Sequence, residues 1–433
     1  METPADETGQ PYVRHADAWW RSWLTTVYFR SVAEADPARE LAEVWPPLPA
    51  GQVFVIAAGK SAERMASAAL RHYPHDRVTG LVVTPEPPRV PMAPLQAHTA
   101  SHPVPDARSV EAGKAVLHAA DAARPNDHVL VLLSGGASSL MVAPRQPLEV
   151  EDLARLGSAL LRAGAPIADV NLVRRHTDRL KGGGLAEAAH PAPVTLAFAS
   201  DVIGDDPRIV GSGPATVQPW QPQAAAAVMR QYGLAGDPVT AMLDGENGQG
   251  ARLEAGKPAV TTRLVSAQDE AVQAAVRMAS RASNVVVEVC PDVDEDALAA
   301  AARWAANVPE WRLRARAAGR PVVAVSGGEV TVRVAGDGNG GPNSTFAVGF
   351  GLALDAHDGI HLLAADTDGF DGVGGHAGGF ADATVWRDAD RSGAHDAVRR
   401  SDTLAWLKAR QGAFTTGQTG VNANDLRILV VEP

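Results

Sequence analysis

The sequence predicts two α/β domains, and three observations support this prediction. The chain has 433 residues, more than one ordinary hydrophobic core accommodates. Short apolar runs alternate with longer amphipathic segments in both halves, which is typical of parallel α/β folds. Between residues 234 and 258 the composition turns to Gly, Asp, Asn and Pro, as in a linker. We therefore expect one domain over residues 1–240 and a second over residues 255–433.

The first half is expected to open its sheet with a strand–Gly-Lys–helix unit. A broad apolar helix over 16–44 precedes strand 53–58, Gly59, Lys60 and helix 61–72. The further elements expected in this half are strand 81–84, helix 109–123, strand 129–133, helices 149–163 and 168–189, strand 194–199 and helix 223–232.

The second half repeats the alternation of strands and helices. Its expected elements are strand 261–265, helix 269–282, strand 285–290, helix 296–306, strands 321–325 and 331–334, helix 345–356, strand 361–365, helices near 382 and over 403–410, and strand 427–431. Alternation in both halves indicates two α/β domains with a cleft between them.

Composition excludes several classes of function. The net charge of −11 argues against nucleic acid or an anionic membrane as a partner, although a local cationic pocket could still bind a phosphorylated ligand. The single cysteine, Cys290, excludes an intrachain disulfide framework and fits a reducing cytoplasm. No basic-then-apolar leader opens the chain, and no apolar run approaches about 18 residues. We expect a cytoplasmic protein without a membrane span.

Five expected strand ends carry residues that suit a ligand better than a plain turn. They are Gly59-Lys60, Ser134-Gly135-Gly136, Asp201, Ser326-Gly327-Gly328-Glu329 and Asp366-Thr367-Asp368. Ligands of open parallel sheets bind beyond the carboxyl ends of the strands. Glycines let backbone N–H groups approach phosphate oxygens, lysine neutralises a phosphoryl group, and carboxylates hold Mg²⁺ or accept a proton.

The stretch 171–214 concentrates this chemistry. Its cations, glycines and acids are Arg174, Arg175, Arg179, Lys181, Gly182 to Gly184, Asp201, Asp205 and Asp206. Such a set suits an anionic, metal-bound ligand, while a solvated helix followed by a turn is the alternative. His102 and His176 are further site candidates, each with a loop or capping role as the alternative.

Familiar catalytic signatures are absent. The turn Gly59-Lys60-Ser61 lacks the upstream glycine of a phosphate-binding loop, and the glycines over 336–341 do not follow a strand with the spacing of a dinucleotide fingerprint. The sequence contains no GxSxG, HExxH or CxxC.

Eight segments nevertheless resemble the glycerate 2-kinase family of the two-domain type that ends in a MOFRL domain, formerly described as hydroxypyruvate reductase. They are AAGKSAERMA (57–66), SHPVPD (101–106), LLSGGASSLMVAP (132–144), NLVRRHTDRLKGGGLA (171–186), SDVIGDDPRIVGSGP (200–214), SGGEVTV (326–332), DTDGFDGVGG (366–375) and TGQTGVNANDLRI (416–428). The resemblance implies a Rossmann-like parallel sheet, a C-terminal mixed sheet and a deep interdomain cleft. It also implies ATP- and Mg²⁺-dependent phosphorylation of the 2-hydroxyl of D-glycerate, by a monomer or homodimer.

The same resemblance assigns roles to residues of this chain. Catalytic roles fall on Lys60, Arg175, Asp201 and Asp206, the last two also as metal ligands. Nucleotide or phosphate binding falls on Ser134, Gly135, Gly136, Ser138, Lys181, Gly182 and Gly183. We also expect the small hydroxy acid to be bound by His102, Ser326, Gly327, Glu329, Asn343, Asp368, Phe370 and Asn422, of which Phe370 departs from the family pattern.

Departures from the family pattern lie mainly in the second half, with one at Gly184 in the first. Pro342 stands where the pattern has an arginine, Gly184 where it has another, and Phe370 and His376 are new. A lost charged contact weakens anion binding by about 1.5–3 kcal/mol. Three hypotheses follow: a kinase for D-glycerate or a related acceptor; a divergent homologue with lost or changed activity, which binds a ligand or runs other chemistry in the same cleft; and, least favoured, a hydroxypyruvate reductase.

Overall fold

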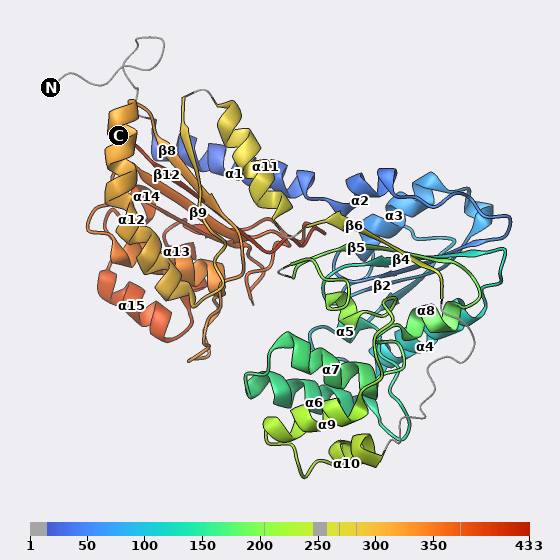
Figure 1. Cartoon of the computed structure of the whole chain (residues 1–433). Helices are drawn as coiled ribbons and strands as arrows, with labels where there is room; N and C mark the ends of the chain where they lie inside the picture. The colour runs from blue at the N-terminus through green and yellow to red at the C-terminus, as the bar shows by residue number, and fades with distance from the viewer. Residues whose placement is uncertain (1–14, 203, 246–257, 268, 283, 373) are drawn as a thin grey trace. The chain divides into compact units, whose positions relative to one another are not determined.

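The computed structural model describes residues 15–202, 204–245, 258–267, 269–282, 284–372 and 374–433. The chain forms two compact units (Figure 1). The first unit comprises residues 37–267, and the second comprises residues 268–433 together with the segment up to residue 36. This division differs from the expected boundary, because the strand near residue 260 joins the first sheet and the N-terminal helix joins the second unit. The interdomain cleft stays a prediction.

The first unit is built on a parallel sheet of six strands, as expected. Its strands are β1 (Val53–Ala58), β2 (Val78–Thr84), β3 (Gln96–Thr99), β4 (His128–Leu133), β5 (Val194–Ala199) and β6 (Val260–Ser266). Their order is β3-β2-β1-β4-β5-β6, and all pairs are parallel. This is the doubly wound order in which the direction of winding reverses between β1 and β4, and ligands bind at that reversal. The two strands end level, with Ala58 paired to Leu133.

Helices cover both faces of this sheet. The helices described in the first unit are α2 (Pro37–Glu40), η1 (Leu41–Glu43), α3 (Ala62–His72), η2 (His75–Arg77), α4 (Ala107–Asp121), α5 (Ala137–Leu140), α6 (Val150–Arg162), α7 (Ile167–Thr177), α8 (Gly184–Ala189), η3 (Val210–Ser212), α9 (Pro222–Gln231) and α10 (Pro238–Gly245). One core packs α3 against the sheet, and another packs α4, α5 and α8 against its other face. Helices α6, α7, α9 and α10 form a separate helical layer with its own apolar core (Figure 1).

The second unit contains a mixed sheet, which confirms the expected architecture. Its strands are β7 (Val286–Val289), β8 (Val322–Ser326), β9 (Ile360–Asp366), β10 (Gly378–Asp382), β11 (Ala413–Phe414) and β12 (Asp425–Val431), in the order β11-β10-β9-β12-β8-β7. Among the described strands of this sheet, β7 and β8 pair in parallel and the other pairs are antiparallel. The strand expected over 331–334 does not form; residue 331 makes a single bridge.

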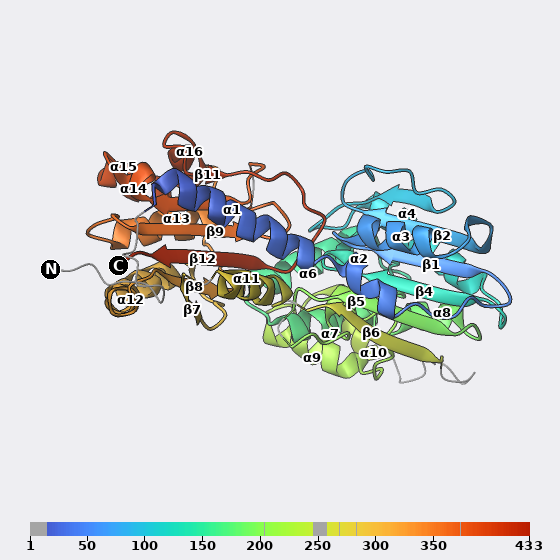
Figure 2. The same ribbon diagram turned by 90° about the horizontal axis from the view of Figure 1, so that it is seen from above.

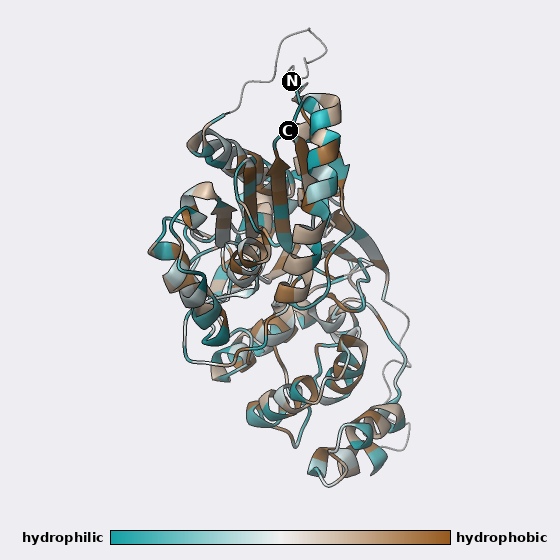
Figure 3. Cartoon of the chain, turned by 90° about the vertical axis from the view of Figure 1, so that its left-hand side faces the viewer, coloured by the Kyte–Doolittle hydropathy of each residue, from teal (hydrophilic) through white to brown (hydrophobic). Residues whose placement is uncertain are grey.

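Two apolar cores flank the mixed sheet. The helices of this unit are α1 (Asp17–Glu34), α11 (Glu270–Arg281), α12 (Ala297–Ala318), α13 (Pro342–Ala353), α14 (Ala383–Trp386), α15 (Arg391–Arg399) and α16 (Thr403–Lys408). Helices α12 and α13 pack on one face, and α1 and α11 on the other. In Figure 3 the strands are mostly brown while the helices alternate brown and teal, as expected of a buried sheet under amphipathic helices. No helix within the described residues is both long and apolar enough to cross a membrane.

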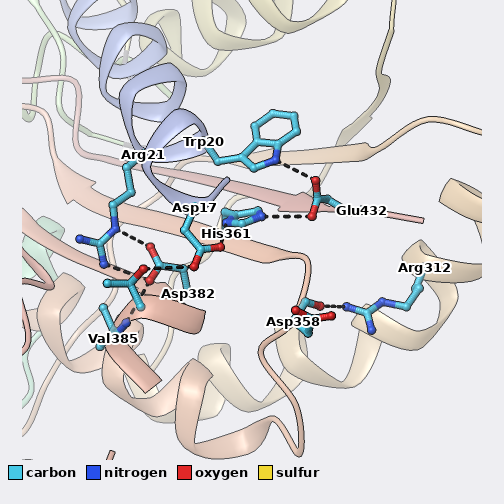
Figure 4. A network of polar contacts seen from close by, with 10 residues as sticks. Asp17, Trp20, Arg21, Arg312, Asp358, His361, Asp382, Val385 and Glu432 are labelled. Carbon is cyan, nitrogen blue, oxygen red and sulfur yellow. Dashed lines mark hydrogen bonds and ion pairs between the residues drawn. The ribbon is translucent and has the colours of Figure 1, made fainter. Parts of the chain in front are cut away.

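The expected helix over 16–44 is broken, and its first part is anchored in the second unit. Helix α1 ends at Glu34 and lies along β9 (Figure 2). Its Trp20 indole donates to Glu432 at 3.0 Å, and its Arg21 guanidinium pairs with Asp382 (Figure 4). These contacts, formed across the whole length of the chain, explain why the N-terminal segment belongs to the C-terminal half.

Candidate active site

The loops after β1 and β4 are joined by two hydrogen bonds that backbone N–H groups donate. The Lys60 N–H donates to the Gly135 carbonyl at 2.9 Å, and the Ser61 N–H donates to Ser134 Oγ at 2.9 Å. Gly59 has φ 127°, and a Cβ there would lie 2.2 Å from Ser134 Oγ. Only glycine fits this position, because the two loops touch and the backbone is left-handed. The structure therefore brings Lys60 and the Ser-Gly-Gly loop together at the winding reversal.

His102 joins the same group from the loop after β3. Its Nδ1 lies 2.9 Å from Ser139 Oγ on α5. Gly136 has φ 89°, and a Cβ there would lie 3.3 Å from the His102 ring, so the imidazole covers the turn that begins α5. Ser138 lies in the same short helix. His102, the Ser-Gly-Gly loop and Lys60 thus occupy one edge of the sheet, as the sequence predicted.

Lys181 is buried rather than displayed on a loop. Its side chain is 1% exposed, and Nζ donates to the Met141 carbonyl at 2.7 Å. Burial lowers the pKa of Lys181 to about 8; nearby Asp178 opposes the shift and Arg174 adds to it. The helix expected over 168–189 breaks at this point, because α7 ends at Thr177 and α8 begins at Gly184.

The glycines after Lys181 are bonded to the protein's own backbone. The N–H of Gly182 donates to the Ser212 carbonyl at 3.0 Å, and the N–H of Gly183 donates to the Gly213 carbonyl at 2.8 Å. A Cβ on Gly183 would lie 2.5 Å from Val217 Cα. The expectation that these amides cradle a phosphate is therefore not supported by their geometry; they fasten the chain segment that carries Lys181.

The acidic loop after β5 holds one engaged carboxylate and one unsatisfied carboxylate oxygen. Asp206 accepts two hydrogen bonds from Nε of Arg208 and one from its Nη2, and this pairing lowers the pKa of Asp206. Asp205 Oδ1 is buried without a hydrogen-bond partner among the described residues. Asp201 lies two residues after the end of β5, the strand beside β4. Asp205, which the sequence noted but gave no role, thus offers an oxygen that a cation could satisfy.

Arg175 lies close to this loop. Its Nη1 donates to Gln218 at 2.8 Å, and burial lowers the pKa of Arg175, with Arg208 adding to the effect. His176, by contrast, is buried within α7, and its Nε2 accepts the Gln221 N–H at 2.7 Å.

The second unit buries the predicted substrate residue Asn343 in a charged network. Asn343 is 1% exposed and donates to Asp425 at 2.5 Å. Arg427, fully buried, pairs with Asp425 and donates to the Gly327 carbonyl at 2.6 Å. Burial raises the pKa of Asp425, and Arg427 opposes that shift. Ser326 is also fully buried. These buried residues stabilise the end of β8 and the start of β12. No role was predicted for Arg427, because the sequence of its strand indicates only an apolar element.

The loop after β9 presents the exposed candidates. Phe370 is 43% exposed, and its N–H donates to the Asp368 carboxylate at 2.7 Å. Pro342 is the first residue of α13, where proline is well accommodated. Glu329 is exposed after β8, and Asn422 is buried before β12.

Within the described residues, no three His, Cys, Asp or Glu side chains gather into a metal-binding cluster.

Known families and known proteins match this chain over most of its length. Two family models match the chain: a domain of unknown function (DUF4147) over residues 24–244 and the MOFRL family over residues 322–425. A D-glycerate 2-kinase from Thermotoga maritima is 32% identical and covers 92% of this chain and 95% of its own length. A relative from Agrobacterium vitis, whose name gives it provisionally as a hydroxypyruvate reductase, is 35% identical and covers 98% of both.

A solved structure agrees with both the sequence matches and the fold. The crystal structure of glycerate kinase from Thermotoga maritima superposes with a TM-score of 0.83 at 30% identity, covering 96% of this chain and 100% of that one. The matched segments span both units described above. The chain therefore belongs to the glycerate 2-kinase family, in the type that combines a DUF4147 domain with a MOFRL domain.

Proposed function

We propose that this chain is an ATP-dependent kinase that transfers the γ-phosphoryl group to the 2-hydroxyl of D-glycerate or a closely related hydroxy acid. Family membership supports a phosphotransferase with a nucleotide and a small-molecule substrate. The observation that carries the proposal is the joining of Lys60 to the Ser134–Gly136 loop at the reversal between β1 and β4.

We assign to Lys60 the role of stabilising the phosphoryl group during its transfer. Phosphoryl transfer needs positioning and charge neutralisation more than covalent chemistry, and a lysine supplies a compact positive charge. The Ser134 to Gly136 turn and Ser138 would orient phosphate oxygens nearby. Arg175 stands beside the acidic loop and would add positive charge as negative charge develops.

Mg²⁺ fits the loop after β5. Carboxylate oxygens are the ligands that Mg²⁺ prefers, and Asp205 Oδ1 is buried without a protein partner among the described residues. We assign Asp201 and Asp205 to the metal, in place of the pair Asp201 and Asp206, because Arg208 already engages the Asp206 carboxylate. When bound, the ion would neutralise phosphate charge.

The proposal is tested by an acceptor panel. ADP release from ATP and Mg²⁺ should require D-glycerate or a related 2-hydroxy acid, and the product should be its phosphate ester. The same preparation given NADH and hydroxypyruvate should oxidise no NADH, which separates the kinase from the reductase. ATP left unconsumed across the whole panel by folded protein would overturn the proposal.

A further inference from the structure

His361 lies buried near the start of β9, between a carboxylate of α1 and a carboxylate that follows β12. Its side chain is 1% exposed, its Nδ1 lies 3.6 Å from Asp17 Oδ1, and its Nε2 lies 3.5 Å from Glu432 Oε2 (Figure 4). Neither ring nitrogen makes a hydrogen bond within the described residues. Asp17 is the first residue of α1, and Glu432 directly follows β12. The imidazole therefore lies where α1 meets the second sheet.

The two carboxylates suit a doubly protonated ring. A neutral imidazole has one N–H donor and one lone pair, whereas an imidazolium donates from both nitrogens. A neutral His361 would turn its lone pair toward one of the two carboxylates, while the imidazolium can form an ion pair with both. Trp20 favours the same state, because its ring stacks on His361 with the centroids 5.7 Å apart, within the range of a cation–π attraction.

Each of the two carboxylates is fixed by a hydrogen bond to its other oxygen. Asp17 Oδ2 accepts the Thr384 hydroxyl at 3.1 Å, and Glu432 Oε1 accepts the Trp20 indole N–H at 3.0 Å. Asp17 Oδ1 and Glu432 Oε2 are thereby directed at the imidazole of His361. The contacts of the ring are thus built into the attachment of α1.

A second ion pair attaches α1 beside this histidine. Asp382 lies opposite His361 in the register of β9 and β10, and it pairs with Arg21 of α1. His15 lies next along the chain, where its ring stacks on Trp19. The pairing of Arg21 with Asp382 does not involve the imidazole, so α1 keeps one attachment whatever the charge of His361.

This group of residues is separate from the candidate active site. His361 is the second residue of β9, whereas Asp368 and Phe370 follow the other end of the strand. The chain passes from the second unit to the first shortly after α1, at residue 36. A change in how firmly α1 is attached therefore acts on a segment that links the two units.

We propose that His361 is a pH-sensitive attachment point for α1. The imidazolium binds Asp17 and Glu432 and stabilises α1 on the second sheet, and loss of one ring proton turns a lone pair toward a carboxylate and loosens the helix. Histidine is the side chain whose charge ordinarily changes between about pH 5 and about pH 8. The attachment is thus present at lower pH and weakens as the pH rises. The inference does not depend on the proposed kinase function.

Hydrogen exchange of the α1 amides, measured by mass spectrometry and corrected for the intrinsic rate at each pH, tests the proposal. Wild-type protection of α1 should fall roughly tenfold or more between about pH 6 and about pH 8.5, as expected when a hydrogen bond to a charged group is lost. His361→Gln cannot change its charge, so α1 should be weakly protected at both pH values. His395→Gln, at an exposed position of α15, is the matched control and should respond as the wild type does.

Two results would overturn the proposal. One is wild-type protection of α1 that is equal at both pH values, and the other is a folded His361→Gln variant whose α1 responds to pH as the wild type does. If His361→Gln does not fold, Asp17→Asn decides the question, because it keeps the ring and removes one of its carboxylates. The fall in protection should then be smaller than in the wild type, and an undiminished fall would overturn the proposal. Because the exchange of α1 is resolved by itself, the titration of Lys181 in the first unit does not affect the reading.

Discussion

Replacing Lys181 by methionine is expected to stabilise the first unit while weakening nucleotide binding. Burial lowers the pKa of Lys181 from 10.5 to about 8. At about 1.4 kcal/mol per pKa unit, the charged amine disfavours the folded state by about 3 kcal/mol at pH 7. The variant loses the hydrogen bond from Nζ to the Met141 carbonyl, worth about 1 kcal/mol. Methionine has a similar length and packs adaptably, so the net gain should be about 2 kcal/mol.

The gain should depend on pH in a defined direction. Below pH 8 the amine of Lys181 is protonated in both the folded and the unfolded state, so the full penalty applies. Between pH 8 and 10.5 the folded state releases the proton and the unfolded state keeps it, so wild-type stability rises in that window. Above this window the penalty is gone, and the variant should be slightly less stable than the wild type.

Urea unfolding followed by circular dichroism at pH 7 and pH 10 measures this difference. Lys114→Met, on an exposed position of α4, is the matched control and should show no change. A Lys181→Met variant that is less stable than the wild type by the same amount at both pH values would refute the reasoning, since the buried charge would then carry no penalty.

Three further predictions concern the second unit and the metal. Asp425→Asn leaves the buried Arg427 without the carboxylate it pairs with, so urea unfolding should show that the free energy of unfolding falls by about 3–5 kcal/mol. A fall of less than about 1 kcal/mol would show that this ion pair does not stabilise the second unit. Trp20→Phe removes the indole N–H that donates to Glu432 and should destabilise the second unit by about 1–3 kcal/mol in the same assay. A variant as stable as the wild type would show that this hydrogen bond does not anchor α1. Asp205→Asn should raise the Mg²⁺ concentration needed for half-maximal rate; an unchanged Mg²⁺ dependence would remove Asp205 from the metal site.

Most strands were predictable from the sequence, whereas β3, β10 and the two-residue strand β11 were not. Strands β1, β4 and β5 are nearly continuous apolar runs, because both of their faces are covered by helices. Strand β3, QAHT, is mostly polar and lies at the sheet edge, so it carries no such signal. Strand β10, GGFAD, is rich in glycine, and its pairing with β9 depends on contacts that local propensity does not contain.

Some features of the candidate site were likewise predictable from the sequence, and others were not. Lys60, His102 and the Ser134 loop were predictable because the carboxyl ends of parallel strands share one edge of the sheet. A pocket lined by residues of α6, α7 and the loops after β3 and β4 was not, because its wall brings together segments that are distant in the sequence. The backbone bonds of Gly182 and the burial of Lys181 likewise depend on segments distant in the sequence.

The most direct test of the central claim is the rate of phosphorylation in two lysine variants. With ATP, Mg²⁺ and D-glycerate, ³¹P NMR should detect a phosphate ester and ADP for the wild type and for Lys114→Met. Lys60→Met should bind ADP but transfer phosphate about 10²–10³-fold more slowly, as expected when a charge-stabilising group is removed from a transition state. Equal ester formation by folded Lys60→Met would contradict the assignment of Lys60 and of the edge between β1 and β4 as the place of phosphoryl transfer.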